Sequence, residues 1–291
     1  MATASQWLQA ARPRTLPAAV APVLVGTGAA AYADGVVWWK AALALLVALA
    51  LQVGVNYAND YSDGVRGTDA ERVGPLRLTG AGLAAPRAVK AAAFAAFGVG
   101  AVAGLALAAT SAWWLVAIGA ICIVAAWYYT GGSKPYGYAG LGEVAVFVFF
   151  GLVAVNGTEF VQTKHFSVTG LISSIAVGAL ACSLLVVNNL RDIPGDTVSG
   201  KVTLAVRLGE ARTRHFYALL VTLPIAGSIA VAVITKQWWV LASLVFAAPA
   251  SQAARTVSGE ARGPALIPAL GQTSMAELVW AAGLALPLLL G

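Results

Sequence analysis

Unbroken apolar runs of about twenty residues recur along this 291-residue chain, and a helix of that length crosses the hydrocarbon layer of a bilayer. Only 10% of the residues are charged and 59% are hydrophobic, whereas soluble domains carry about 25% charged residues. A transmembrane barrel would instead alternate apolar and polar residues along each strand. We therefore predict an all-α, polytopic membrane protein that forms a single integral membrane domain over residues 1–291.

The apolar runs predict nine transmembrane helices. They are expected at residues 16–33, 37–57, 90–109, 111–130, 141–161, 167–188, 216–235, 237–254 and 266–290. Short and long junctions alternate between them, and the longer, polar junctions are 58–89, 131–140, 189–215 and 255–265. This alternation predicts that the functional loops lie on one side of the membrane.

The charge distribution predicts which side that is. Fifteen of the 18 Lys and Arg residues lie in the N-terminal segment, in the longer junctions or, for Lys90, directly beside one, and the other three are Lys40, Lys164 and Lys236. Because basic loops stay in the cytoplasm, we expect a cell-membrane protein with a cytoplasmic N-terminus, an external C-terminus and an active site that faces the cytoplasm. The net charge of +6 is explained by this topology, so no nucleic-acid partner is expected.

Two acidic clusters close the second and sixth predicted spans. The first contains Asn59, Asp60 and Asp63, and the second runs from Asn188 to Asp196. Their equivalent positions, four helices apart, predict two four-helix pseudo-repeats plus a ninth helix. Within each cluster the polar residues are spaced i, i+4, which places them on one face of a helix.

Carboxylate and amide oxygens are hard ligands that suit Mg²⁺, which is usually held by one or two carboxylates together with waters and substrate phosphates. Two facing clusters would therefore bind a diphosphate through Mg²⁺ ions. Ordinary helix capping is the alternative for any single Asp, and Asp69 is as readily a solvated residue as a ligand. Basic residues that suit phosphate accompany the acids, although topology explains some of them: Arg66, Arg72, Arg77, Lys134, Lys201 and Arg207.

Several segments resemble the UbiA superfamily of intramembrane prenyltransferases. They are NYANDYSDGVRG at 56–67, ERVGPLRLTGAG at 71–82, YTGGSKPYGYAGLGE at 129–143 and the stretch 188–209. The second and third are most similar to the branch that prenylates 1,4-dihydroxy-2-naphthoate. The resemblance implies diphosphate-bound Mg²⁺ on Asn59, Asp60, Asp63, Asn188, Asp192 and Asp196. The third Asp usual in the first motif is replaced here by Gly67, and Asp69 is a candidate substitute.

The resemblance further implies transfer of a polyprenyl group from polyprenyl diphosphate to 1,4-dihydroxy-2-naphthoate, with loss of CO₂ and diphosphate, giving demethylmenaquinone. The expected catalytic residues are Asp60, Asp63, Asp192, Asp196 and Lys201. The expected substrate-binding residues are Asn59, Arg66, Arg72, Arg77, Tyr129, Lys134, Glu143, Asn188 and Arg207.

Aromatic residues near the acids could stabilise a carbocation by cation–π contact or anchor the protein at the interface: Trp127, Tyr128, Tyr129, Tyr136 and Tyr138. Glu143 could orient or deprotonate the aromatic acceptor, and the lipid-soluble tail should reach its pocket sideways from the membrane lipid. A 4-hydroxybenzoate acceptor and, in a different class, a membrane transporter are the alternative functions.

Overall fold

The computed structural model describes residues 2–67 and 76–291, and every regular element within them is helical. The N-terminal part contains α1 (Ala4–Ala10), η1 (Pro13–Thr15), α2 (Pro17–Tyr32), α3 (Trp38–Arg66), α4 (Pro86–Thr110) and α5 (Leu115–Tyr128). The middle part contains η2 (Tyr136–Ala139), α6 (Gly142–Val146), η3 (Phe147–Val153), α7 (Ala154–Thr163) and α8 (Val168–Val198). The chain closes with α9 (Leu204–Thr235), η4 (Trp238–Phe246), α10 (Ala247–Ser258), η5 (Gly263–Leu266) and α11 (Ile267–Leu290).

Helices occur at all nine expected positions, and the all-α membrane class is confirmed. Among the described residues, seven helical stretches are long and apolar enough to cross a bilayer, or eight if the bent pair Ala4–Thr15 and Pro17–Tyr32 is one span. That pair bends by 50° where Arg12 adopts a left-handed conformation beside prolines at 13 and 17, since proline interrupts helical hydrogen bonding. The helix α5 has only 14 residues, so the structure does not establish nine crossings.

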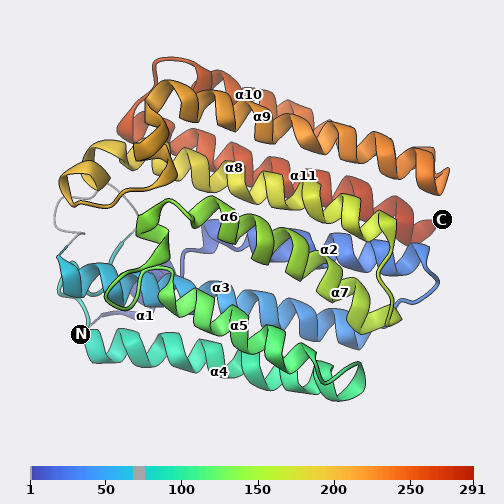
Figure 1. Ribbon diagram of the computed structural model, residues 1–291, viewed down its shortest axis with the longest axis horizontal. Helices are drawn as coiled ribbons and strands as arrows, with labels where there is room; N and C mark the ends of the chain where they lie inside the picture. Colours follow the sequence, from blue (N-terminus) through green and yellow to red (C-terminus); the bar gives the residue numbers. More distant parts are fainter. Residues whose placement is uncertain (1, 68–75) are drawn as a thin grey trace.

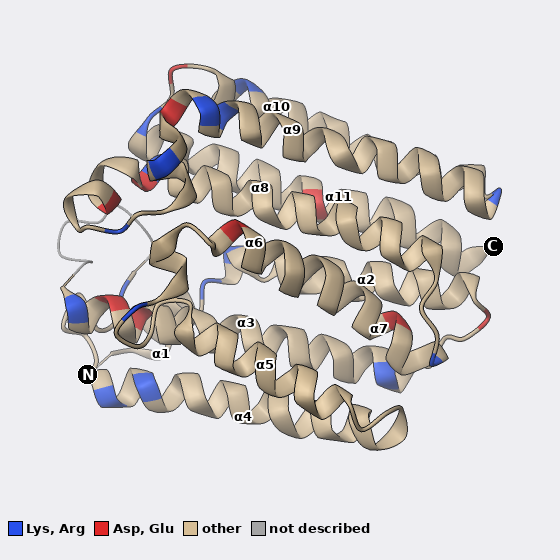
Figure 2. Ribbon diagram, in the orientation of Figure 1, with Lys and Arg blue, Asp and Glu red and all other residues tan. Residues whose placement is uncertain are grey.

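The helices lie side by side along the long axis of the molecule (Figure 1). The closest neighbours are α3 with α4, α8 with α9, and α2 with α11. The Lys, Arg, Asp and Glu residues gather mainly at one end of this bundle, which is also where α1 lies (Figure 2). The helix α11 ends at the opposite end.

The two helices that carry the acidic clusters continue past their apolar spans. The expected spans end at residues 57 and 188, but α3 continues to Arg66 and α8 to Val198. Gly67 ends α3 in the left-handed region, at φ 75°, which glycine adopts without the Cβ clash of most L-residues. The position at which the resemblance leads us to expect a third Asp is therefore the C-cap of the helix.

The fifth predicted span is not a uniform α-helix. Between α6 and α7 the chain forms a π-helix, η3, which is wider than an α-helix and common at functional sites. One side of η3 lies at backbone contact distance from α8, because a Cβ on Gly151 would stand 2.7 Å from Gly178 Cα. The other side faces the interior between α2, α3 and α5 and contributes to the cavity described below.

Candidate active site

The first acidic cluster occupies the last turns of α3. Asp60 is buried, and its two carboxylate oxygens accept hydrogen bonds from the backbone N–H groups of Leu78 (2.7 Å) and Thr79 (2.8 Å). Gly64, one turn further on, allows close approach, since a Cβ there would stand 2.6 Å from Thr79 Cβ. Asp60 therefore attaches the chain at 78–79 to α3, which is a structural role in addition to any ligand role.

Asp63 is buried among polar partners. The hydroxyl of Tyr138 donates to Asp63 Oδ1 at 2.6 Å, and the guanidinium of Arg77 lies 3.5 Å from Oδ2. Such charge-assisted contacts stabilise an ionised carboxylate. The neighbouring Asn59 Oδ1 accepts a hydrogen bond from Thr130 Oγ1 at 2.7 Å, which links α3 to the loop after α5.

The second acidic cluster, on α8, is also paired with cations. Arg191 donates to both carboxylate oxygens of Asp192, at 2.7 and 2.8 Å, and to Asn188 Oδ1 at 2.8 Å. Lys201 Nζ lies 3.5 Å from Asp196 Oδ1. Because an unpaired buried charge is costly, these pairs allow the acids to remain ionised beside the apolar bundle.

The loop between α5 and α6 joins the two clusters. Arg66, at the end of α3, donates to the carbonyl groups of Thr130 and Gly132. On the other side, the N–H of Val202 donates to the carbonyl of Tyr138 at 3.0 Å. The end of α3 and the segment after α8 are far apart in the sequence. They therefore lie on either side of this loop, at one end of the bundle.

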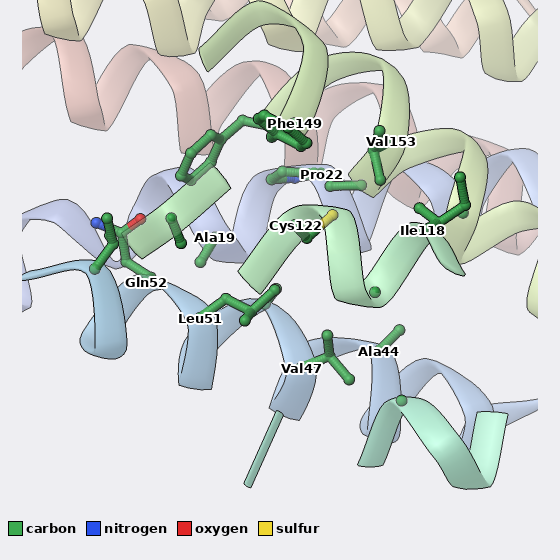
Figure 3. A pocket seen from close by; sticks show the side chains of 18 of the residues that line it. Ala19, Pro22, Ala44, Val47, Leu51, Gln52, Ile118, Cys122, Phe149 and Val153 are labelled. Atoms are coloured by element: carbon green, nitrogen blue, oxygen red, sulfur yellow. The ribbon is translucent and has the colours of Figure 1, made fainter. Parts of the chain in front are cut away.

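An apolar cavity of about 340 Å³ extends from the first cluster into the bundle. Eight residues of α3 line it at helical spacing, from Ala44 to Asn59, a distance of about 22 Å at 1.5 Å per residue. Side chains from α2, α5 and η3 surround the same space, including Pro22, Ile118 and Phe149 (Figure 3). Its polar lining on α3 consists of Gln52, Asn56 and Asn59, so the cavity is polar near the acids and apolar further along.

Two of the aromatic candidates, Tyr129 and Tyr136, line this cavity. Their rings are 5.5 Å apart in a T-shaped arrangement, and the Tyr136 hydroxyl donates to the carbonyl of Ala125 at 2.8 Å. Burial of the loop raises the pKa of Tyr136 to about 12, so its phenol stays protonated at neutral pH. Trp127, Tyr128 and Tyr138 are not among the lining residues.

The remaining predicted residues fall into three groups. Glu143 is buried beside the second cluster, where Asn189 donates to its Oε1 at 2.9 Å, and Arg207 packs against Gly140. Lys134 is exposed in the α5–α6 loop. Arg72 and Asp69 lie outside the described residues.

Sequence reasoning did not select three residues that contact the clusters: Thr130, Asn189 and Arg191. Arg191 stands between Asn188 and Asp192 in the motif and could have been identified from its i+3 spacing. Thr130 donates to Asn59, and Asn189 donates to Glu143. Each of these partners is distant in the sequence, so no local pattern reveals the contact.

The donor set fits magnesium rather than a metal that needs a complete protein cage. Within residues 2–67 and 76–291, no three His, Cys, Asp or Glu side chains converge on one point. Mg²⁺ does not require such a group, because waters and substrate phosphates supply most of its ligands. The buried carboxylates of Asp63, Asp192 and Asp196 and the partly buried amide oxygens of Asn59 and Asn188 are donors of the appropriate kind.

The model of the UbiA prenyltransferase family matches residues 19–266. The chain belongs to this family, so it is a membrane prenyltransferase, and the expected family is confirmed. It is 57% identical over 285 residues to the 1,4-dihydroxy-2-naphthoate octaprenyltransferase of Mycobacterium tuberculosis, covering 98% of this chain and 97% of the relative. It is 40% identical over 228 residues to the enzyme of the same name from Escherichia coli, covering 74% and 72%.

A solved structure has the same fold. The UbiA homolog from Archaeoglobus fulgidus bound to GPP and Mg²⁺ superimposes with a TM-score of 0.68 at 14% identity, covering 98% of this chain and 99% of the other. At this identity the similarity establishes the architecture alone.

Asp60→Ala should lower the free energy of unfolding by roughly 2–4 kcal/mol, because two backbone N–H groups lose their acceptor. Thermal unfolding in detergent measures the change. Ser62→Ala is the matched control: Ser62 is buried on the same helix, and its hydroxyl has no hydrogen-bond partner among the described residues, so its stability should stay near that of the wild type. Equal melting temperatures for both variants would contradict the anchoring role of Asp60.

Proposed function

We propose that the chain transfers a polyprenyl group from polyprenyl diphosphate to 1,4-dihydroxy-2-naphthoate, releasing diphosphate and CO₂ and forming demethylmenaquinone in its reduced, quinol form. The observation that carries the proposal is the long apolar cavity that reaches Asn59 in the first acidic cluster, with the acids of both clusters paired with cations. This arrangement suits a molecule with a charged head and an isoprenoid tail. The acceptor is inferred from the names of the relatives that match nearly the whole chain.

In this proposal Mg²⁺ is held by Asn59, Asp60, Asp63, Asn188, Asp192 and Asp196, among which Asp60 already carries two backbone hydrogen bonds. When bound, the metal neutralises the negative charge that develops on the leaving diphosphate. Arg77 and Lys201 lie beside acids of the two clusters and bind the phosphate oxygens. As the allylic carbon–oxygen bond breaks, its electron pair leaves with the diphosphate.

The remaining steps take place between the prenyl cation and the acceptor ring. The apolar walls of the cavity exclude water, which would otherwise capture the cation. The ring carbon that bears the carboxylate attacks the cation and forms the new carbon–carbon bond. Loss of CO₂ returns an electron pair to the ring and restores its aromaticity. The rings of Tyr129 and Tyr136, which line the cavity, stabilise the cation by cation–π contact.

Glu143 is assigned to the acceptor. It is buried at the start of α6, its Oε1 accepts a hydrogen bond from Asn189, and its Oε2 has no hydrogen-bond partner among the described residues. An unpaired buried carboxylate oxygen is costly, and a hydroxyl of the acceptor would satisfy it. The same contact would withdraw a proton and make the ring more nucleophilic.

We further propose that the chain crosses the membrane nine times in two four-helix pseudo-repeats plus one, with the acid clusters on the cytoplasmic side. The excess of Lys and Arg at that end supports this orientation. Tryptophans at the starts of α3 and η4 and between α4 and α5 are largely exposed, with 66% exposure for Trp38, 84% for Trp239 and 69% for Trp113. Interfacial aromatic belts have this character.

Purified protein supplied with a polyprenyl diphosphate and 1,4-dihydroxy-2-naphthoate should form the prenylated product only when Mg²⁺ is present. Liquid chromatography with mass spectrometry detects the product and its loss of CO₂. 4-Hydroxybenzoate in a parallel reaction should give none, because the cavity serves the naphthoate branch. A product from the benzoate alone would overturn the acceptor assignment and favour the second candidate acceptor.

Glu143→Gln should lower kcat about 10²-fold or more, the usual contribution of a general base, and change the KM for the prenyl diphosphate little. Steady-state kinetics with each substrate varied in turn measures both effects. Asn156→Ala is the control, because Asn156 lies in the same membrane segment and donates only to the carbonyl of Leu152. An unchanged kcat in Glu143→Gln would exclude the carboxylate from the chemistry.

The orientation can be tested with single cysteines at exposed positions at the two ends. Lys134→Cys, in the α5–α6 loop, should react with a membrane-impermeant maleimide only after the cells are permeabilised, and Lys236→Cys should react in intact cells. The wild type measures the background, since Cys182 is buried and Cys122 is partly buried. The reverse pattern of labelling would place the acid clusters outside the cell.

A further inference from the structure

One side chain of the α5–α6 loop, that of Tyr138, contacts an acid of the first cluster and the cation that is paired with the second. Tyr138 donates its hydroxyl to Asp63 Oδ1 at 2.6 Å. The guanidinium of Arg66 lies 5.4 Å from the centre of the Tyr138 ring, and Lys201 Nζ lies 5.3 Å from it. Lys201 is in turn paired with Asp196. A continuous series of contacts therefore runs from α3 through Tyr138 to the segment after α8.

The backbone supports the same connection independently. The carbonyl of Tyr138 accepts a hydrogen bond from Val202, the residue after Lys201. On the other side of the loop, Arg66 donates to the carbonyl groups of Thr130 and Gly132. The position of Tyr138 is thus defined relative to both clusters by contacts that do not depend on its side chain.

The chemistry of the ring explains why tyrosine suits this position. Arg66 and Lys201 carry like charges, which repel each other at short range. The negative face of an aromatic ring attracts cations, so the ring offsets this repulsion and holds both cations near one point. The hydroxyl forms a charge-assisted hydrogen bond that fixes the orientation of one carboxylate oxygen of Asp63. A phenylalanine would supply only the ring, and a leucine neither the ring nor the hydroxyl.

The position of Tyr138 separates it from the carbocation chemistry. It is not among the residues that line the cavity, whereas Tyr129 and Tyr136 are. Its ring and its hydroxyl are engaged by residues of the two clusters. The side chain is therefore placed to organise the groups that bind the charged head of the donor rather than to contact the reacting carbon atoms.

We propose that Tyr138 is a positioning residue that sets the spacing and orientation of the two halves of the diphosphate site. This inference rests on the proposed function, because it assumes that Asp63, Arg66, Lys201 and Asp196 act together on one magnesium-bound diphosphate. Loss of the hydroxyl removes the contact that orients Asp63 Oδ1, although Arg77 still lies beside Oδ2. Loss of the ring also allows the two cations to separate, so the affinity for the anion falls further.

Direct binding tests the proposal. The probe is an S-thiolo analogue of farnesyl diphosphate with Mg²⁺, titrated calorimetrically into the detergent-solubilised, full-length protein. Tyr138→Phe should bind it about tenfold more weakly, as expected for one hydrogen bond to a charged group, and Tyr138→Leu about a hundredfold more weakly. The Mg²⁺ concentration needed for half-maximal binding should rise in the same order.

Tyr217→Phe is the matched control, because the hydroxyl of Tyr217 is hydrogen-bonded to Thr273 at 2.9 Å in the buried core between α9 and α11. It should show the melting temperature of Tyr138→Phe but the affinity of the wild type. Binding by Tyr138→Phe within twofold of the wild type would overturn the proposal, whether or not Tyr138→Leu folds. Failure of the wild type to bind the analogue with Mg²⁺ would instead refute the proposed function itself, so the two failures are distinguishable.

Discussion

The pairing of buried carboxylates with cations at one end of an apolar bundle is the interaction on which the rest of this structure depends. Asp63 and Asp192 are both buried, and transfer of an unpaired carboxylate into such surroundings is strongly unfavourable. Arg77 and Arg191 supply the compensating charge. The Arg77–Asp63 pair also joins the end of α3 to the chain before α4, whereas Arg191 and Asp192 are neighbours on α8.

The same pairs make the site suitable for an anion. In the proposed function the carboxylates would exchange their protein partners for divalent cations, and the Arg and Lys side chains would then bind phosphate oxygens. Acids of both clusters are already paired with bases in the free protein, and a metal-bound diphosphate would add positive and negative charge together.

The cavity and the first acidic cluster share one helix, α3, and this determines their relation. One face of α3 lines the cavity from Ala44 to Asn59, and the first cluster continues from Asn59 to Asp63. In the proposed function, the position of the charged head would therefore define where the tail begins. The π-helix η3 forms part of the opposite wall, and its close contact with α8 through Gly151 holds that wall against the helix that carries the second cluster further along. Changes in α3 or η3 would affect head and tail together.

The fold class, the helix positions, the two acidic motifs and the family could all be predicted from the sequence, because hydrophobic run length and i, i+4 spacing are local properties. The helix ends at Arg66 and Val198, the bend near Arg12 and the π-helix at Phe147–Val153 could not, since they depend on capping geometry and packing rather than on hydropathy. The contacts of Asp60 with Leu78 and Thr79, and of Tyr138 with both clusters, join residues that are distant along the chain. Only the tertiary structure decides such contacts, because the free energy that maintains them comes from burying and pairing charges that no single helix can bring together.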